Sequence, residues 1–438
     1  MAVSPVRFEI PVFCLFVLFW LASVFLVKWE IGLPVRTLIL FFGVLYISII
    51  YRSNFTYIFF KNFHFWALLS IGLIGFFMSS FYTLDLVASG LYSLKWIIQP
   101  ALILVFTMLC CLYIGEKTVV IFYAGVILLS CTVAILQYFD LQLAWDLKSQ
   151  LDAIQSIDRV ATVIAENDSG FGVYNDRFRA RGLSYSPIHL GYQIALVWGL
   201  FYISWQNNNP TIFPFPRLVR YTIIGVLFFA IIATGTRSIF FGILLLYILH
   251  FLFNTKNKSL LIIVALISIA FISIGSTFYA ALMNALDIRV LSIENSSSFS
   301  RLPLALFGLL LFADNPIGHG WLIEAEVYAN EYWQYLHQFQ NAEAIVQLGL
   351  HNHLIKTLFV YGLGGLATLF FYIKSIFKYY GLVYLIGLSP YYFHSLFHND
   401  GIFLGGNYIW VFMGIIHFDF VKASIANKVS HNFQSKGF

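Results

Sequence analysis

The residues of this chain that could do chemistry are arginines and histidines in four clusters beside apolar runs. The first spans residues 179–191 (Arg-Ala-Arg-Gly-Leu-Ser-Tyr-Ser-Pro-Ile-His-Leu-Gly), and the second spans 233–238 (Ala-Thr-Gly-Thr-Arg-Ser). The third runs from Arg301 to a turn at 314–320, and the fourth is His351-Asn352-His353. A guanidinium binds phosphate oxygens through a bidentate fork, and an imidazole removes a proton from a hydroxyl. The clusters therefore suit chemistry between a diphosphate and a hydroxyl.

Each cluster also has a purely structural interpretation, which the sequence leaves open. Ser186 and Pro187 are typical of a helix N-cap and first helical position. Arginines at a membrane boundary can simply reach the lipid headgroups, and the turn 314–320 can simply end a helix. The histidines fit no familiar zinc spacing, and every cysteine lies inside an apolar run, so we expect no metal and no cofactor.

The composition places these clusters in a membrane protein. The chain has 438 residues, of which 60% are hydrophobic and 10% are charged. A soluble domain carries about 25% charged residues, so an ordinary cytosolic enzyme or a disordered protein is excluded. The net charge of +5 is too small to indicate a polyanionic partner, so no nucleic acid is expected.

Apolar runs predict an all-α, polytopic protein of about twelve transmembrane helices, the first retained rather than cleaved as a signal peptide. The predicted helices cover roughly residues 10–27, 35–51, 63–82, 97–114, 118–139, 187–205, 218–234, 238–253, 259–281, 354–373, 380–397 and 403–421. Basic residues gather in alternate short loops, which predicts that both termini are cytoplasmic. All four clusters then face the same, periplasmic side.

We expect one membrane domain over residues 1–438 with two large periplasmic loops. The first covers 140–186, and the second covers 282–353 and contains short helices. Loops of this length are usually functional or disordered, and their aromatic and turn residues favour an ordered structure. The middles of the helices are almost free of charge, unlike those of ion-coupled transporters. Because of this, attack of a sugar hydroxyl on a lipid-linked diphosphate donor is favoured over transport.

The four clusters resemble motifs of the bacterial O-antigen ligase/O-antigen polymerase superfamily of membrane glycosyltransferases. The segment 179–187 looks like the family's Arg-x-x-Gly…Pro motif, and 234–238 is similar to its Thr-x-Ser-Arg turn, with Thr236 where serine is commoner. Arg301 and the segment 314–320 resemble its Arg…Pro-x-Gly-x-Gly stretch. His351-Asn352, followed after nine residues by 362–365 (Gly-Leu-Gly-Gly), fits its His-Asn/Ser-x9-Gly-x-x-Gly pattern.

The resemblance implies a GT-C-type glycosyltransferase of the inner membrane with a periplasmic active site and no metal. Its donor is an undecaprenyl-diphosphate-linked glycan, and its acceptor is a second lipid-linked glycan or a lipid A core. Membrane lipids surround it, and a chain-length regulator is a further expected partner. Two essential arginines and one histidine carry over as Arg179 (or Arg181), Arg237 and His351. The remaining candidates, expected to bind substrate, are Arg181, Arg301, His319, Asn352 and His353.

Three alternatives stay open at this point. A flippase or exporter of lipid-linked oligosaccharides would also need many helices and basic groups near phosphates. A protein O-oligosaccharyltransferase shares the motifs, but those enzymes are longer, with an additional C-terminal region. A membrane scaffold without chemistry would not require the four clusters to meet in one place.

Overall fold

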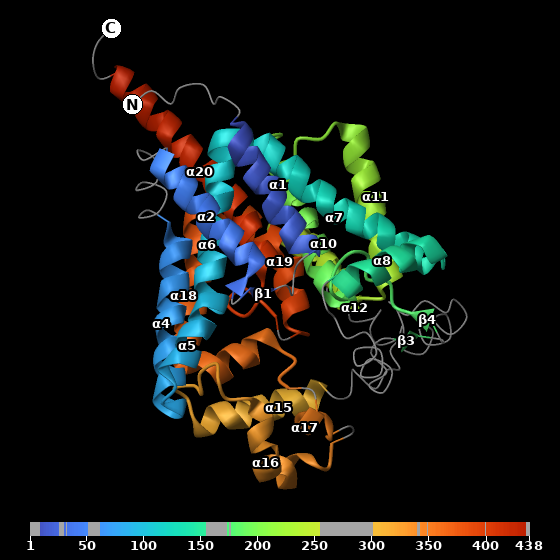
Figure 1. Ribbon diagram of the computed structural model, residues 1–438, viewed down its shortest axis with the longest axis vertical. Coiled ribbons are helices and arrows are strands. Elements are labelled where there is room, and N and C mark those ends of the chain that lie inside the picture. Colours follow the sequence, from blue (N-terminus) through green and yellow to red (C-terminus); the bar gives the residue numbers. More distant parts are fainter. Residues whose placement is uncertain are drawn as a thin grey trace.

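The computed structural model describes residues 9–25, 30–31, 33–50, 62–154, 173–174, 177–254, 301–339, 342–347, 349–398 and 400–434. Long helices form a bundle, with the start of α1 (Ile10–Phe25) and the end of α20 (Asn407–Gln434) at one end (Figure 1). Three shorter helices, α15 (Arg301–Asp314), α16 (Ala329–Leu336) and α17 (Ala344–Gln347), lie beyond the other end. We call this second end the distal end.

The described residues are mostly helical, as the sequence predicts. The first half comprises α1, α2 (Val35–Ile50), α4 (Phe63–Thr83), α5 (Leu86–Ser93), η1 (Leu94–Ile98), α6 (Gln99–Cys110), η2 (Cys111–Gly115), α7 (Glu116–Tyr138), α8 (Gln142–Ile154) and α10 (Pro187–Gln206). The second half comprises α11 (Arg217–Thr234), α12 (Arg237–Asn254), α15, η4 (Ala325–Tyr328), α16, α17, α18 (His353–Tyr380), α19 (Leu382–Ser395) and α20. Two antiparallel pairs of two-residue strands join β1 (Glu30–Ile31) to β2 (Leu33–Pro34) and β3 (Val173–Tyr174) to β4 (Arg177–Phe178).

Four helical segments within the described ranges are long and apolar enough to cross a membrane: Phe63–Thr83, Leu86–Tyr138, Arg217–Thr234 and His353–Tyr380. Shorter apolar helices cover Ile10–Ser23, Val35–Ile50, Arg237–Phe253 and Pro303–Asp314. The count of twelve spans and the extents of the two loops stay predictions. The helix expected at 259–281 lies outside the described residues.

The segment Leu86–Tyr138 differs from the sequence prediction at its start. The expected helix began at residue 97, but the structure starts at Leu86, where the carboxylate of Asp85 accepts a hydrogen bond from the Ala88 amide at 2.8 Å. This N-cap satisfies an amide that the first helical turn leaves without a partner. The segment is broken at Gly115, whose φ of +90° separates α6 and η2 from α7.

Glycine contacts bring α19 close to two neighbouring helices. Gly199 of α10 faces Gly387 of α19 so closely that a β-carbon on Gly199 would lie 2.5 Å from the Gly387 carbonyl oxygen. Gly242 of α12 similarly faces Pro390 of α19, with 2.9 Å from a built β-carbon to the proline Cα. Small residues at such crossings allow the close packing that holds helices together in a membrane.

Helix α18 is broken at Gly362, and the preceding segment 315–320 fills the break. Gly362 has φ +58° and ψ −149°, which interrupts the helical hydrogen bonds. The amides of His319 and Gly320 donate to the carbonyls of Phe359 and Val360 at 2.8 and 2.9 Å, and the Leu363 amide donates to the Pro316 carbonyl at 2.8 Å. Two sequence clusters about forty residues apart thus form one structural unit, because each supplies the backbone groups that the other needs.

Side chains extend this unit into the bundle. The Trp321 amide donates to the hydroxyl of Ser79 on α4 at 2.6 Å. The Trp321 indole donates to the Tyr361 hydroxyl at 2.8 Å, and this hydroxyl donates to the Phe403 carbonyl at 3.0 Å. The segment is therefore fixed to α4, α18 and the connection between α19 and α20.

We expect Gly362→Ala to lower the thermal midpoint of the purified protein by about 5 °C or more. An L side chain at positive φ costs about 1–2 kcal/mol, and its β-carbon would overlap Pro316 and Ile317. The measurement is tryptophan fluorescence during heating in detergent. Gly225→Ala on α11 is the matched control, because its β-carbon would meet nothing within 4 Å and alanine favours a helix. Equal midpoints for the two variants would contradict the role assigned to the break.

Candidate functional site

The first two sequence clusters meet at the turn between α11 and α12. Gly235 caps α11 with φ +60°, and Arg237 begins α12 directly after it. The Arg179 Nε donates to the Thr234 carbonyl at 3.0 Å, and its Nη2 donates to the Thr236 hydroxyl at 3.2 Å. These bonds use two of the five guanidinium donors and fix Arg179 against the turn that carries Arg237.

The segment after Arg179 begins α10 as the sequence predicts. Ser186 is the N-cap, with its hydroxyl accepting from the His189 amide at 3.3 Å, and Pro187 takes the first helical position. The Thr236 hydroxyl also reaches the Pro187 carbonyl at 3.5 Å. The N-terminus of α10 therefore lies against the α11–α12 turn.

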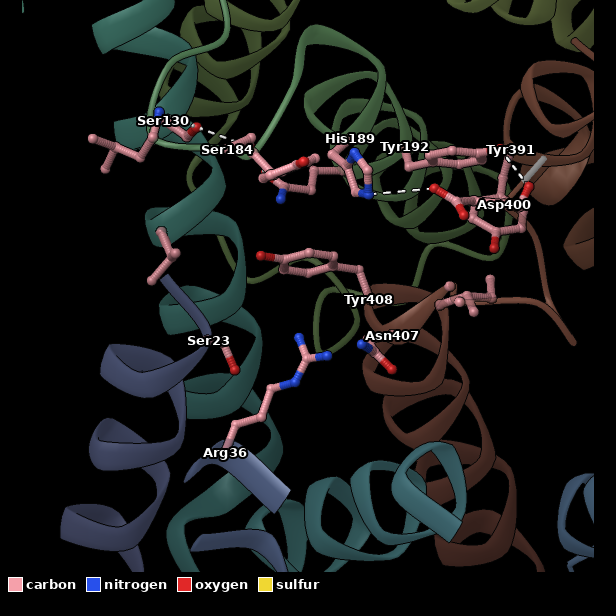
Figure 2. A pocket seen from close by; sticks show the side chains of 17 residues that line it. Ser23, Arg36, Ser130, Ser184, His189, Tyr192, Tyr391, Asp400, Asn407 and Tyr408 are labelled. Atoms are coloured by element: carbon pink, nitrogen blue, oxygen red, sulfur yellow. Dashed lines mark hydrogen bonds and ion pairs between the residues drawn. The ribbon is translucent and has the colours of Figure 1, made fainter. Parts of the chain in front are cut away.

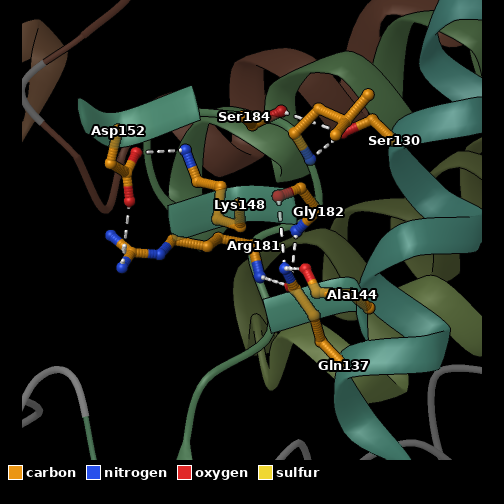
Figure 3. Close-up of polar contacts among 9 residues, drawn as sticks. Ser130, Gln137, Ala144, Lys148, Asp152, Arg181, Gly182 and Ser184 are labelled. Carbon is orange, nitrogen blue, oxygen red and sulfur yellow. Dashed lines mark hydrogen bonds and ion pairs between the residues drawn. The ribbon is translucent and has the colours of Figure 1, made fainter. Parts of the chain in front are cut away.

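Arg181 has a different environment from Arg179. Its backbone amide donates to the Gln137 side chain at 3.0 Å, and its guanidinium lies 3.6 Å from the Asp152 carboxylate (Figure 3). Asp152 also accepts from the Lys148 ammonium at 2.7 Å, and both of these side chains are buried. The Asp152 carboxylate partly compensates the charges of Lys148 and Arg181. The Arg181 side chain is thereby held against α8.

A hydroxyl and two imidazoles connect α12 to α10 and α19. The Ser238 hydroxyl lies 2.7 Å from His394 Nδ1 and 3.4 Å from His398 Nε2. The His394 Nε2 donates to the Ile188 carbonyl at 3.0 Å. His398 lies just after the end of α19, and together with His394 it helps to position the residue that follows Arg237.

The fourth cluster forms the N-terminus of α18. The Asn352 side chain is the N-cap and accepts from the amides of Leu354 and Ile355 at 2.9 and 3.1 Å. His353 is buried, and its ring packs directly on Gly401. His351 is half-buried, and its Nδ1 donates to the Gly349 carbonyl at 3.1 Å, which leaves a lone pair on Nε2. This tautomer suits a general base.

The third cluster, which runs from Arg301 to the turn at 314–320, lies at the distal end and packs against α18. His319 is buried, and its ring stacks on Phe359 with centroids 4.5 Å apart. Burial lowers the pKa of His319, so the ring is neutral at physiological pH. Arg301 begins α15, and its side chain lies outside the described part of the chain. The substrate-binding roles of both residues stay predictions.

A cavity of about 290 Å³ lies beside these clusters (Figure 2). The residues that line it come from α1, α2, α7, α10, α19, the start of α20 and the segments just before α10 and α20. They are mostly hydroxyl, amide and aromatic side chains: Ser23, Arg36, Val126, Ser130, Leu183, Ser184, Tyr185, His189, Tyr192, Gln193, Tyr391, Asp400, Gly405, Gly406, Asn407, Tyr408 and Ile409. Arg179, Arg237 and His351 are not among them. The cavity is thus separate from the turn between α11 and α12 that carries Arg237, which we call the arginine turn.

His189 and Asp400 form the partly exposed rim of this cavity. The His189 Nε2 lies 3.3 Å from the Asp400 carboxylate, and the Tyr192 hydroxyl donates to the Asp400 carbonyl at 2.5 Å. Arg36 lines the same cavity but lies far from these residues in the sequence, and no sequence pattern predicts that they meet. One signal was present, because Arg36 is a charged residue inside an apolar run, and such residues often mark functional sites in membranes.

Within the described residues, no three His, Cys, Asp or Glu side chains are grouped as metal ligands would be. Comparison with protein families gives one match, to the family described as O-Antigen ligase, over residues 222–370. The matched range covers about a third of the chain, and over this range the chain resembles the O-antigen ligase/polymerase family. Comparisons with curated proteins and with solved structures find no match.

The match divides the chain into a matched range, residues 222–370, and the parts that flank it. Arg237, Arg301, His319 and the α18 N-terminus belong to the matched range, and this is the part that carries three of the four clusters. Every residue that lines the cavity lies outside 222–370. The cavity is therefore built by the parts of this chain that flank the family domain.

We expect Asp152→Asn to destabilise the protein, because the Lys148 ammonium and the Arg181 guanidinium then lose a buried carboxylate. Breaking a buried ion pair by removing one partner typically costs about 3–5 kcal/mol. The thermal midpoint in detergent should fall clearly below that of Asp146→Asn, a control at an exposed carboxylate on the same helix. If both variants unfold at the wild-type temperature, the cluster does not anchor Arg181.

Proposed function

We propose that this protein transfers a glycan from undecaprenyl diphosphate to a hydroxyl acceptor at the periplasmic face of the bacterial inner membrane. The observation that carries the proposal is the position of Arg179 on the turn that leads into Arg237. Two guanidinium-bearing residues from segments far apart in sequence thereby belong to one small region. Guanidinium pairs are suited to the oxygens of a diphosphate.

The orientation proposal rests on where charge lies along the bundle. The end opposite the distal end carries Lys117 at the start of α7, Arg217 at the start of α11, Lys378 near the end of α18 and Lys422 on α20. Lys and Arg accumulate in cytoplasmic segments of membrane proteins. The arginine turn, the α18 N-terminus and the cavity then belong to the periplasmic half.

Arg179 rather than Arg181 is the diphosphate ligand in this proposal. Asp152 already lies beside the Arg181 guanidinium, and a carboxylate at 3.6 Å would repel a bound phosphate. Arg179 instead donates to a carbonyl and a hydroxyl of the α11–α12 turn, and these bonds orient its guanidinium toward the turn that carries Arg237. Arg179 and Arg237 together would stabilise the charge of the leaving group.

In the proposed reaction, His351 Nε2 removes the proton from the acceptor hydroxyl. The acceptor oxygen forms a bond to the anomeric carbon of the donor glycan as the bond from that carbon to the diphosphate oxygen breaks. The electron pair leaves with undecaprenyl diphosphate, whose developing charge the arginines stabilise. The Gly349 carbonyl holds the His351 ring in the tautomer that this step needs.

We expect His351→Ala to reduce glycan transfer by about 10²–10⁴-fold, the usual contribution of a positioned general base. Transfer is measured with purified protein and a fluorescent undecaprenyl-diphosphate-linked oligosaccharide. His337→Ala is the control, because His337 is an exposed histidine at the end of α16 on the same side. Full activity of His351→Ala at normal expression would remove this residue from catalysis.

Arg179→Gln and Arg237→Gln should each lower the transfer rate at least about tenfold, because one charge-assisted bond contributes about 1.5–3 kcal/mol. Arg217→Gln, an exposed arginine at the start of α11, serves as control. If the protein moves the lipid-linked glycan across a vesicle membrane without forming a transfer product, it is an exporter and the proposal is wrong. In cells, loss of a ligase leaves long unattached chains, whereas loss of a polymerase leaves a single repeat unit on the acceptor.

A further inference from the structure

The cavity combines elements from nearly opposite ends of the chain. Ser23 and Arg36 come from α1 and α2, whereas Tyr391 comes from α19 and Asn407 from the start of α20 (Figure 2). The mechanism proposed above uses none of these residues. Because the proposed reaction does not use these residues, we ask which ligand the cavity itself could bind.

Arg36 is the permanently cationic side chain in the lining of this cavity. Its guanidinium points into the space between Asn407 and Tyr408 (Figure 2). With their amide groups turned so that the oxygens face this guanidinium, Gln99 and Asn407 accept from it, the latter at 3.1 and 3.3 Å. Gln99 is almost fully buried, so these contacts hold the guanidinium in one orientation. An oriented, permanently charged planar fork is suited to an anion, and above all to a carboxylate.

Tyr391 provides an independent indication of a ligand. Its side chain is 1% exposed and lines the cavity, and its hydroxyl has no hydrogen-bond partner within the described part of the chain. Buried hydroxyls are almost always hydrogen-bonded, because an unsatisfied one costs about 1–3 kcal/mol. A hydroxyl of a bound molecule would satisfy it.

The size and lining of the cavity define the class of ligand. A volume of about 290 Å³ lies at the small end of ligand pockets, which suits one monosaccharide rather than an oligosaccharide. Four tyrosines contribute apolar ring surface, and the serine, asparagine and glutamine side chains contribute hydrogen bonds. Asp400 at the rim repels a multiply charged phosphate more strongly than it repels a single carboxylate, so a singly charged group is favoured beside Arg36.

We propose that this cavity binds one acidic sugar unit of the acceptor glycan, with its carboxylate on Arg36 and a ring hydroxyl on Tyr391. The inference rests on the proposed function, to which it adds the chemical class of the acceptor. The lining lies entirely outside residues 222–370, so the family match does not supply this preference. Arg36 and Tyr391 act as specificity-determining residues.

The test measures binding directly, so that it does not depend on transfer activity. Full-length protein in detergent is titrated with glucuronic acid, glucose or inorganic phosphate, and saturation-transfer NMR reports the bound ligand. We expect glucuronic acid to bind to the wild type at least tenfold more tightly than glucose. Arg36→Gln should remove this difference, and Tyr391→Phe should weaken glucuronic acid binding several-fold. Arg217→Gln, at an exposed arginine remote from the cavity, should bind as the wild type does.

Each outcome decides between the alternatives. Equal binding of glucose and glucuronic acid, or no effect of Arg36→Gln, would overturn the proposal. Phosphate displacing glucuronic acid at lower concentration would assign the cavity to a phosphate group instead. If Arg36→Gln fails to fold, Arg36→Lys keeps the charge but loses the fork, and it should bind glucuronic acid about threefold to tenfold more weakly. Loss of glycan transfer with intact glucuronic acid binding would count against the proposed function and not against this cavity.

Discussion

Three backbone hydrogen bonds between the segment 315–320 and the break in α18 are the constraint on which the distal half depends. The carbonyls of Phe359 and Val360 would face a low-dielectric interior without partners if the segment were absent. Because the same segment binds α4 through Trp321 and Ser79, these bonds also set the height of the α18 N-terminus within the bundle. The half-buried His351 lies just before α18, so its position depends on this junction farther along that helix.

The arginine turn is fixed by a second set of contacts that reaches it from the other side. Arg179 bonds to the turn itself, and Ser238 bonds to His394 and His398 on and after α19. The connection from 396 to 406 then links both regions, because His353 packs on Gly401 and Tyr361 bonds to Phe403. This connection is thus one of several contacts between residues 222–370 and the flanking helices, beside the crossing of α12 and α19 at Gly242 and Pro390. The cavity is lined by the flanking helices.

The sequence is sufficient to predict those features of local structure that depend only on neighbouring residues. The Ser186-Pro187 helix start and the turn at Gly235 follow from residue type alone, and the structure has both. The long-range features could not be predicted in this way. Whether Asp152 pairs with Arg181, or whether Arg36 of α2 meets Asn407 of α20, depends on packing between distant segments. The break at Gly362 was hidden for the same reason, since its glycines fit a closely packed unbroken helix equally well.

The break in α18 also has a consequence for the order in which the chain is assembled. His319 and Phe359 are 40 positions apart, with the loop first, so a ribosome completes 315–320 before it completes the helix. The backbone groups that fill the interruption are already made when the interrupted segment leaves the ribosome. A circularly permuted chain that began after residue 320 would reverse this order. Its α18 would then enter the lipid while the carbonyls of Phe359 and Val360 lacked hydrogen-bond donors, because the segment 315–320 would be synthesised later.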